Sequence, residues 1–373
     1  MKYYIIAGEA SGDLHGSNLV KEILQLQPEA QFRGWGGDMM QTAGVQLVKH
    51  YRDLAFMGFV EVIMNLRTIL GNLAFCKQDI LQHKPDTLIL VDYPGFNLRI
   101  AEWAKQHGIR VIYYIAPQVW AWKENRVKKM KLCIDKMLVI LPFEKAYFED
   151  KWNWQVEYVG HPLVNVIDRF KADTTVQAAL PDTNLPVIAL LPGSRKQEIL
   201  KKLPIMLEVT RQFPQYRFVV AMAPGQEDSF YTSLLSPYEN VSAVRNQTYA
   251  LLKQSAAALV TSGTATLETA LFKVPEIVCY KGSNISYQIA KRLIKVKYIS
   301  LVNLIMDKLV VKELIQNDLT PQHLVAELTQ LLQNSGRQRQ LDQDYAQLHT
   351  LLSAGGNASA NAAESIVKFM RSK

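Results

Sequence analysis

Short apolar runs alternate with longer amphipathic segments along most of the chain. The runs are rich in β-branched and aromatic residues, which favours strands, and the segments between them repeat apolar residues at helical spacing. In the first half this pattern predicts strands at 3–8, 31–37, 87–92, 111–117, 136–141 and 156–162, and helices near 14–26, 57–82, 96–107, 123–133 and 143–150. Apolar strands separated by helices are typical of a parallel sheet covered on both faces, so we expect a doubly wound α/β domain.

The alternation stops once and then restarts. Residues 171–186 are polar and contain two prolines, which predicts a linker. Further strands are predicted at 187–194, 217–224, 241–246, 257–263 and 276–282. We therefore predict two Rossmann-like domains, at 1–168 and 187–345, followed by a C-terminal helix in 346–373 that either packs back on the first domain or is exchanged in a dimer. Ligands of such domains bind at the carboxyl ends of the strands, near the point where strand order reverses, so two facing domains would enclose a cleft.

The composition narrows the class of protein. The net charge of +8 suits nucleic acid, acidic lipid headgroups or phosphorylated substrates as partners, although a solvated basic surface explains it as well. The three cysteines are far apart along the chain, which argues against a disulfide framework and fits a reducing cytoplasm. No stretch approaches the roughly 18 uncharged apolar residues of a transmembrane helix. We expect a soluble or peripheral protein, and the absence of HExxH, CxxC pairs or clustered His and Cys predicts no metal site.

Two loops of the predicted second domain suit a diphosphate. In "LLPGSRKQE" (190–198), Gly193 permits a sharp turn, Ser194 can cap the following helix, and Arg195 offers a forked cation to phosphate oxygens. A capped helix with a surface arginine is the alternative. In "VTSGTATLETA" (260–270), small and hydroxyl residues again join a strand to a helix, which lets a phosphate approach the backbone. The predicted donor-site residues of this loop are Ser262, Gly263, Thr264 and Ala265.

Glu268 follows that loop within the first turns of the helix. If Thr264 is the N-cap, the capping-box position falls on Leu267, so capping does not explain the acid. A carboxylate one turn beyond a phosphate loop can accept hydrogen bonds from a ribose diol, as acids do in dinucleotide-binding folds. Nucleotide binding is therefore favoured over a plain helix start.

The loops of the predicted first domain carry acids instead. Asp92 ends a buried strand in "LILVDYPGFN" (88–97), where desolvation would raise its pKa and make it a general base. A turn-forming Asp bonded to its own backbone is the alternative. His161 ends another strand, where it is either structural or a hydrogen-bond partner of a substrate. In "AGEASGD" (7–13), Glu9 and Ser11 would meet sugar hydroxyls or a phosphate, and Asp13 either does the same or caps its helix.

The segment 54–77 is unusually apolar. Its apolar face is interrupted by Glu61 and Arg67, so it does not span a bilayer. A core helix is the ordinary explanation, but so wide an apolar face also fits a membrane interface or bound acyl chains. The basic segment 122–131 could then meet anionic headgroups, or form a solvated face.

Ten short motifs, taken together, resemble one known family. In chain order they are "GEASGD", "MGFVEV", "DYPGFN", "PQVWAW", "LPFEKAYF", "VGHPL", "LPGSR", "SGTATLE", "AKRLIKVKYISLVNL" and "VKELIQ". Their order from Gly8 to about Gln316 is similar to that of the lipid-A-disaccharide synthases, so the resemblance covers most of the chain.

The resemblance implies a GT-B glycosyltransferase fold, with two Rossmann-like domains facing across a cleft. It implies transfer of a diacylglucosamine unit from UDP-diacylglucosamine to 2,3-diacylglucosamine 1-phosphate (lipid X), giving a β-1′,6-linked disaccharide phosphate and UDP. The expected setting is the cytoplasmic face of the inner membrane, whose anionic surface the protein would meet as a peripheral enzyme. No metal, cofactor or nucleic acid is implied, and the resemblance also suggests a homodimer that exchanges C-terminal segments.

Matching the family's motifs residue by residue gives further expectations. Asp92 stands at the position of the family's proposed catalytic aspartate, and Glu9 is the second candidate base. Glu268 and Asn303 match polar donor-site positions. The predicted acceptor site comprises Ser11, Asp13, Asn97 and His161, and the predicted membrane contact comprises Val60, Val62, Ile63, Leu66, Ile69 and Leu70.

This sequence departs from the family's pattern at Gly95, where some members have a second Asp. Three other functions stay open from the residues alone. The chain could be a UDP-sugar epimerase, a glycosyltransferase with a different lipid acceptor, or a non-catalytic protein that binds a UDP-sugar or a lipid. The apolar segment 54–77 disfavours the epimerase, and Asp92 at a strand end disfavours the binding protein.

Overall fold

The computed structural model describes residues 1–373 apart from 55–65, 176–183, 224, 284–286, 289–295 and 373. The chain forms two compact units. The first unit comprises Met1–Pro162 and Leu352–Lys373, and the second comprises Leu163–Leu351. The C-terminal segment is therefore part of the first unit, although the whole second unit separates the two in the sequence.

The first unit contains a parallel sheet of seven strands among the described residues, in the order β3-β2-β1-β4-β5-β6-β7. The strands are β1 (Lys2–Ala7), β2 (Gln31–Gly36), β3 (Val45–His50), β4 (Thr87–Val91), β5 (Arg110–Tyr114), β6 (Lys136–Val139) and β7 (Glu157–Tyr158). Strand order reverses between β1 and β4, which are hydrogen-bonded neighbours. The ends of these two strands are where a ligand site is expected.

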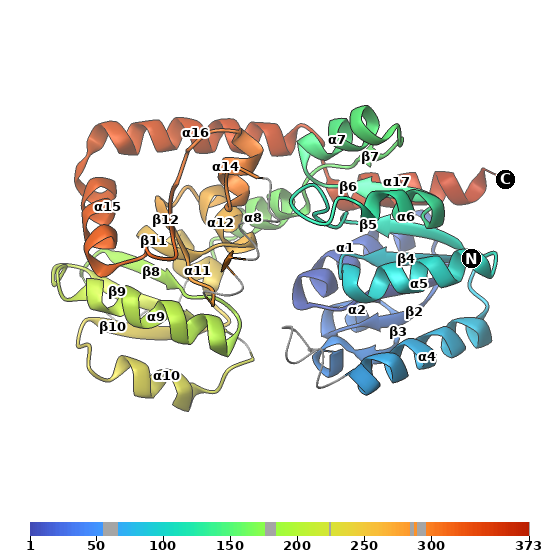
Figure 1. The fold of residues 1–373 in the computed structure, drawn as a ribbon, viewed down its shortest axis with the longest axis horizontal. Coiled ribbons are helices and arrows are strands. Elements are labelled where there is room, and N and C mark those ends of the chain that lie inside the picture. Colours follow the sequence, from blue (N-terminus) through green and yellow to red (C-terminus); the bar gives the residue numbers. More distant parts are fainter. Residues whose placement is uncertain (55–65, 176–183, 224, 284–286, 289–295, 373) are drawn as a thin grey trace. The chain divides into compact units, whose positions relative to one another are not determined.

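Helices cover both faces of this sheet (Figure 1). On one face, apolar side chains of the strands pack against α4 (Leu66–His83), α5 (Pro94–Gln106), α6 (Arg126–Cys133) and α7 (Pro142–Trp152). On the other face they pack against α1 (Ala10–Leu26), α2 (Asp38–Thr42) and α17 (Ala358–Arg371). The short 3₁₀ helix η1 (Tyr51–Leu54) follows β3. Because α17 contacts α1 and contributes Ala362 and Ile366 to the core, the C-terminal helix completes the layer over this face.

The second unit repeats the scheme with six parallel strands among its described residues, in the order β10-β9-β8-β11-β12-β13. The strands are β8 (Val187–Leu191), β9 (Arg217–Met222), β10 (Val241–Arg245), β11 (Ser255–Thr261), β12 (Glu276–Tyr280) and β13 (Lys312–Ile315). The reversal lies between β8 and β11.

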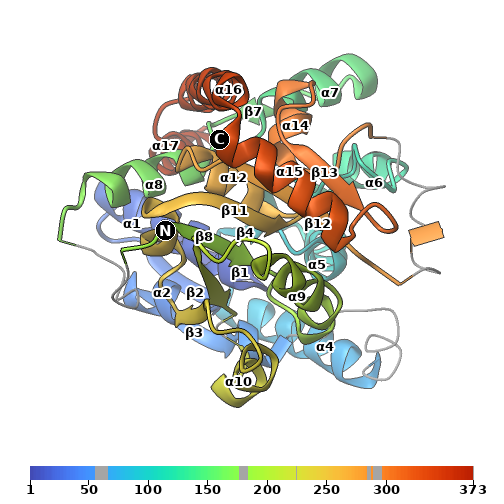
Figure 2. The same cartoon turned by 90° about the vertical axis from the view of Figure 1, so that its left-hand side faces the viewer.

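Among the described residues of the second unit, one helix precedes the first strand and the other helices each come after a strand along the chain. The helices are α8 (Pro162–Ala172), α9 (Lys196–Thr210), α10 (Asp228–Leu235), α11 (Thr248–Lys253), α12 (Thr264–Leu271), α14 (Leu301–Met306), α15 (Pro321–Gln333) and α16 (Ser335–Ser353). α9 and α15 contact each other over the sheet (Figure 2), and α12 contacts α14.

The two parallel sheets with alternating helices confirm the predicted α/β class. Four details differ from the predictions. β3 and β13 were not expected, and the strand expected at 156–162 is only the two-residue β7. The polar segment expected to be a linker begins inside α8, and the break expected near 345 lies inside α16. Within the described residues, no helix is both long and apolar enough to cross a bilayer.

Candidate functional site

In the first unit, the loops after β1 and β4 lie side by side at the reversal point. A Cβ atom on Gly8 would sit 2.3 Å from the ring of Tyr93, so only glycine fits where the two loops meet. Glu9 is the N-cap residue of α1 and lies partly buried beside this contact. The fold therefore brings together Glu9 and Asp92, which are far apart in sequence.

Asp92 and Tyr93 both adopt left-handed backbone conformations, with φ of 44° and 50°. Such conformations cost about 1–3 kcal/mol per residue and cluster at functional sites, where surrounding bonds hold them. Here the Asp92 carbonyl oxygen accepts hydrogen bonds from Asn97 Nδ2 at 2.7 Å and from the Tyr113 hydroxyl at 2.5 Å. The backbone N–H of Asp92 donates to Tyr114 O at 3.1 Å. These contacts hold the Asp92 backbone, and so fix the direction in which its side chain leaves the strand.

The electrostatic surroundings of Asp92 suit a base. Burial, with a smaller contribution from the negative charge of Glu9, raises the pKa of its carboxyl to about 7, and the Tyr93 backbone N–H opposes the shift. A carboxyl group with such a pKa is partly ionised near neutral pH and strongly basic for its type. An ordinary turn aspartate would also accept this hydrogen bond from the Tyr93 backbone N–H, so the raised pKa is the feature that favours a base.

A second carboxyl near Asp92 was not predicted. Glu144 on α7 is 1% exposed and accepts hydrogen bonds from Trp120 Nε1 at 3.1 Å and from the Leu141 backbone N–H at 3.0 Å. Burial raises its pKa to about 7, and the charge of Asp92 contributes to the same shift. The sequence signal is the capping-box position at the start of α7. Glu144 thus links two of the sequence motifs to the acidic site. It lies in "LPFEKAYF", its hydrogen-bond partner Trp120 lies in "PQVWAW", and its charge interacts with that of Asp92.

The other predicted acceptor residues have different surroundings. Ser11 is exposed in the first turn of α1. Asp13 does not cap its own helix: its carboxylate accepts hydrogen bonds from the backbone N–H groups of Gly37, Met39 and Met40, at 2.8–3.1 Å, and so caps α2.

Asn97 is fully buried, and its side-chain amide donates hydrogen bonds to the carbonyl oxygens of Val91 and Asp92. Asp13 and Asn97 therefore hold the backbone that forms the site.

His161 lies buried beside a second histidine. It is 3% exposed and His15 is 7% exposed. Burial lowers the pKa of His161 to about 3, with a contribution from His15, and burial lowers the pKa of His15 to about 4. Both rings are neutral at physiological pH, so His161 can contact a ligand through a hydrogen bond but not through a positive charge.

The apolar segment is only partly described. Val60, Val62 and Ile63 lie outside the described residues, and so does the side chain of Leu66. Of the remaining predicted membrane contacts, Ile69 packs partly buried against the core of the first unit, and Leu70 is 53% exposed.

In the second unit, the loop after β8 supplies cations at the start of α9. Gly193 has a φ of +120°, which favours glycine, and Arg195 follows as the N-cap residue. The sequence predicted Ser194 as the N-cap residue, but the helix begins one residue later, after Arg195. The Arg195 side chain makes no capping hydrogen bond. The side chain of Arg195 is 54% exposed, and its Nη1 atom lies 3.5 Å from Oε1 of Glu198. The first-turn N–H groups and this guanidinium suit an anion.

The loop after β11 is built from small residues, as predicted. Gly263 is the N-cap of α12 with a φ of +147°, so the cap lies one residue earlier than the expected Thr264. Ser262 donates its hydroxyl hydrogen bond to Ile299 O at 2.9 Å. Thr264 is exposed and Ala265 half-buried at the start of the helix. A phosphate group can therefore reach the helix N-terminus without steric hindrance from large side chains.

Glu268 and Asn303 occupy different environments. Glu268 accepts a hydrogen bond from the Tyr249 hydroxyl at 2.6 Å, and burial raises the pKa of its carboxyl. Asn303 is fully buried, and its amide donates to Val311 O and Glu313 Oε1 and accepts from the Val310 and Val311 N–H groups. Because both donors and both acceptor positions are used, Asn303 orders the loop rather than contacting a ligand directly.

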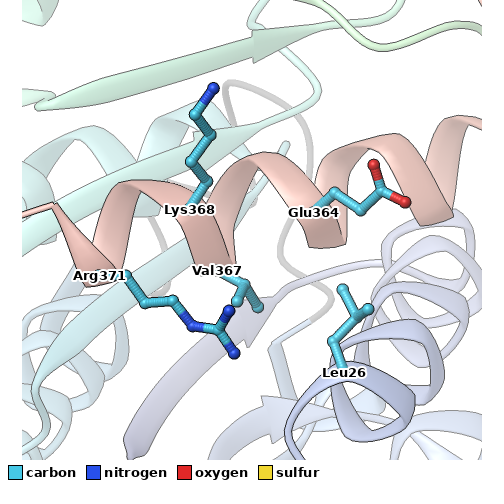
Figure 3. A pocket seen from close by; sticks show the side chains of 5 residues that line it. All are labelled: Leu26, Glu364, Val367, Lys368 and Arg371. Atoms are coloured by element: carbon cyan, nitrogen blue, oxygen red, sulfur yellow. The ribbon is translucent and has the colours of Figure 1, made fainter.

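A further hollow of the first unit contains none of the predicted residues (Figure 3). It measures about 410 Å³ and is lined by Leu26, Glu364, Val367, Lys368 and Arg371. Leu26 ends α1, so this hollow lies at the opposite edge of the sheet from Glu9. Among the described residues, no three His, Cys, Asp or Glu side chains are grouped to hold a metal ion.

Comparison with known proteins gives one consistent family. A family model described as lipid-A-disaccharide synthetase matches residues 3–369. The chain is 38% identical over 375 residues to a lipid-A-disaccharide synthase of Syntrophus aciditrophicus, covering 99% of this chain and 98% of the relative. It is 36% identical over 367 residues to the synthase of Coxiella burnetii strain CbuG_Q212, covering 97% of this chain and 96% of the relative.

Solved structures share the fold at low identity. A UDP-GlcNAc 2-epimerase from Neisseria meningitidis, bound to UDP-GlcNAc, superimposes with a TM-score of 0.66 at 15% identity, covering 99% of this chain and 100% of the other. A calicheamicin glycosyltransferase superimposes with a TM-score of 0.61 at 15% identity, covering 99% and 98%. These likenesses confirm the GT-B type of fold and, at such identities, show the fold alone.

Proposed function

The chain belongs to the lipid-A-disaccharide synthase family, and from this premise we propose that it is an inverting glycosyltransferase of that specificity. The donor would be UDP-2,3-diacylglucosamine and the acceptor 2,3-diacylglucosamine 1-phosphate. The products would be the β-1′,6-linked disaccharide 1-phosphate and UDP. The observation that carries this proposal is Asp92, a carboxyl group of raised pKa held at the end of β4 by a strained backbone.

The second unit would bind the nucleotide. Arg195 and the first-turn N–H groups of α9 and α12 would neutralise the diphosphate, which supplies the electrostatic stabilisation that a leaving group requires. Gly193, Ser194, Ser262, Gly263, Thr264 and Ala265 would line the diphosphate. Glu268 would accept hydrogen bonds from the ribose hydroxyls, and Asn303 would keep the neighbouring loop in place.

The first unit would bind the acceptor and supply the base. Asp92 takes the proton of the acceptor 6-hydroxyl, and that oxygen forms a bond to the anomeric carbon of the donor. The bond from this carbon to the diphosphate oxygen breaks on the opposite side, so the electron pair leaves with UDP and the configuration inverts. Ser11 and the neutral His161 would hydrogen-bond the acceptor, while Asp13 and Asn97 hold the loops.

A direct assay tests the proposal. Purified protein is incubated with UDP-diacylglucosamine and the acceptor monophosphate in detergent, and products are followed by mass spectrometry. We expect a disaccharide phosphate and UDP in equal amounts. A parallel reaction with UDP-GlcNAc alone tests for epimerisation, and formation of a 2-epimer without any disaccharide would contradict the proposal.

We also propose peripheral attachment to an anionic membrane, through α6 and the neighbouring loop. Trp122 and Leu132 are large apolar side chains that are 45% and 76% exposed, and the exposed Lys128 and Lys129 precede Leu132 by one turn of α6. Apolar side chains framed by cations suit a bilayer interface. Replacing both lysines by Glu should reduce sedimentation with phosphatidylglycerol vesicles, and unchanged sedimentation would contradict this role. A homodimer stays a prediction of the family resemblance, to be measured by light scattering.

A further inference from the structure

Beneath the loop after β8 lies a lysine that the site described above does not use. Lys202 is on α9, two turns after Arg195, and only 2% of the residue is exposed. Long side chains of a helix point back toward its N-terminus, which here is the proposed diphosphate site. The Lys202 Nζ atom accordingly lies 3.6 Å from the position that a Cβ atom on Gly193 would occupy.

One acid stands between Lys202 and Arg195. Glu198 Oε1 lies 3.5 Å from Arg195 Nη1, and Glu198 Oε2 lies 3.9 Å from Lys202 Nζ. The same Oε2 atom is 2.8 Å from the place where a Cβ atom on Gly193 would be, so the carboxylate fills the space under the glycine. The loop thus holds one carboxylate against two cations, at distances longer than a good charged hydrogen bond.

Lys202 is an unusual choice for a buried position. Burial lowers the pKa of Lys202, and the negative charge of Glu198 opposes that shift. A buried ammonium with a loosely placed counter-ion destabilises the fold relative to an apolar side chain of similar size. Within the described chain, the Lys202 ammonium makes no hydrogen bond that would explain why a lysine is buried at this position. The missing partner suggests that a ligand supplies it.

We propose that Lys202 provides a second positive charge to the nucleotide diphosphate from beneath the Gly193 loop, with Glu198 occupying that place until the ligand arrives. The inference rests on the proposed function, because it takes the loop after β8 to be the diphosphate site. Two cations at the Gly193 loop match the charge of a diphosphate better than Arg195 alone. On binding, the diphosphate oxygens replace the Glu198 carboxylate between Arg195 and Lys202.

The test compares K202M with K201M in the full-length protein. Lys201 is the exposed neighbour on the same helix, so both variants lose one charge at nearly the same place. UDP and UMP affinities are measured by calorimetry. We expect K202M to bind UDP about tenfold more weakly, equivalent to about 1.4 kcal/mol, with a smaller loss for UMP and little change in K201M. Its melting temperature should stay equal to or rise above that of the unaltered protein.

A second variant keeps the inference testable if K202M folds poorly. E198Q removes the competing negative charge and should strengthen UDP binding several-fold. Equal UDP affinities of K202M and K201M, or unchanged UDP binding by E198Q, would overturn the inference while leaving the proposed function intact. If the unaltered protein binds no UDP, the proposed function fails and the inference fails with it.

Discussion

The two units share one sheet topology but carry opposite charges at the same topological place. In both, strand order reverses between the first strand and the fourth, and loops at that reversal run into helices. The first unit places the carboxyl groups of Glu9 and Asp92 there, and Glu144 on α7 interacts electrostatically with Asp92. The second gathers Arg195, Lys202 and glycine-rich turns. In the proposed function, the shared topology sets the place of each ligand site, and the loop residues determine which ligand binds there.

The backbone differs between the two places as well. In the first unit the left-handed residues at the reversal are Asp92 and Tyr93, which bear side chains and therefore strain. In the second unit they are Gly193 and Gly263, which adopt positive φ at little cost. In the proposed function, the strained backbone aims the carboxyl group of the base, while the phosphate site needs only space and N–H groups.

The largest effect is expected from removing the proposed base. D92N should lower turnover by about 10²–10⁴-fold, because the acceptor hydroxyl loses its proton acceptor. UDP affinity should not change, since the second unit is untouched. Steady-state kinetics and UDP calorimetry measure the two quantities separately, with D53N, an exposed aspartate of η1, as the control. Turnover near the control value would remove Asp92 from the mechanism.

The next effect should appear only in the second unit. R195A should weaken UDP binding by about tenfold or more, because a guanidinium pairs strongly with phosphate oxygens. The control is K196A, which removes a charge from the adjacent exposed residue. Calorimetry with UDP measures both variants. If R195A and K196A bind UDP equally well, the charge difference between the two units does not reflect their ligands.

Sequence patterns predicted the strands of both sheets best where every side chain is buried. β4 and β8 are buried throughout, and every residue in them except Thr87 is apolar, so their runs are unambiguous. β3 and β13 are partly exposed and contain charged residues such as Lys49 and Lys312, and such segments resemble loops. The positions of the site loops could be predicted as well, because parallel strands end at one edge of a sheet.

The roles of single polar residues were harder to predict. Asn97 and Asn303 were expected to contact ligands, but the structure shows their amides bound to backbone groups. Contacting a ligand and holding a loop both require a polar side chain near a strand end, so the sequence alone does not distinguish these two roles. Glu144 and Lys202 lie in segments that resemble ordinary solvated helices. Only the folded chain shows that they are buried beside the two loops.

The smallest expected effect concerns the acidic pair of the first unit. The Glu9 carboxylate raises the pKa of Asp92, so E9Q should lower that pKa. A base acts only when deprotonated, and activity of the unaltered protein should therefore decrease as pH falls through about 7. In E9Q the decrease should begin at lower pH, by less than about one unit, because one partly exposed charge is removed.

The pH dependence of kcat/KM measures this shift and also separates the two candidate bases. If Asp92 is the base, E9Q keeps most of its activity above pH 7 and gains relative activity below it. If Glu9 is the base, E9Q loses activity at every pH, as D92N is expected to do. E22Q is a suitable control, because Glu22 lies on the same helix, away from the reversal point. If the pH profile of E9Q equals that of the unaltered protein, the charge of Glu9 does not affect the pKa of Asp92. Asp92 would then act as a base without help from Glu9.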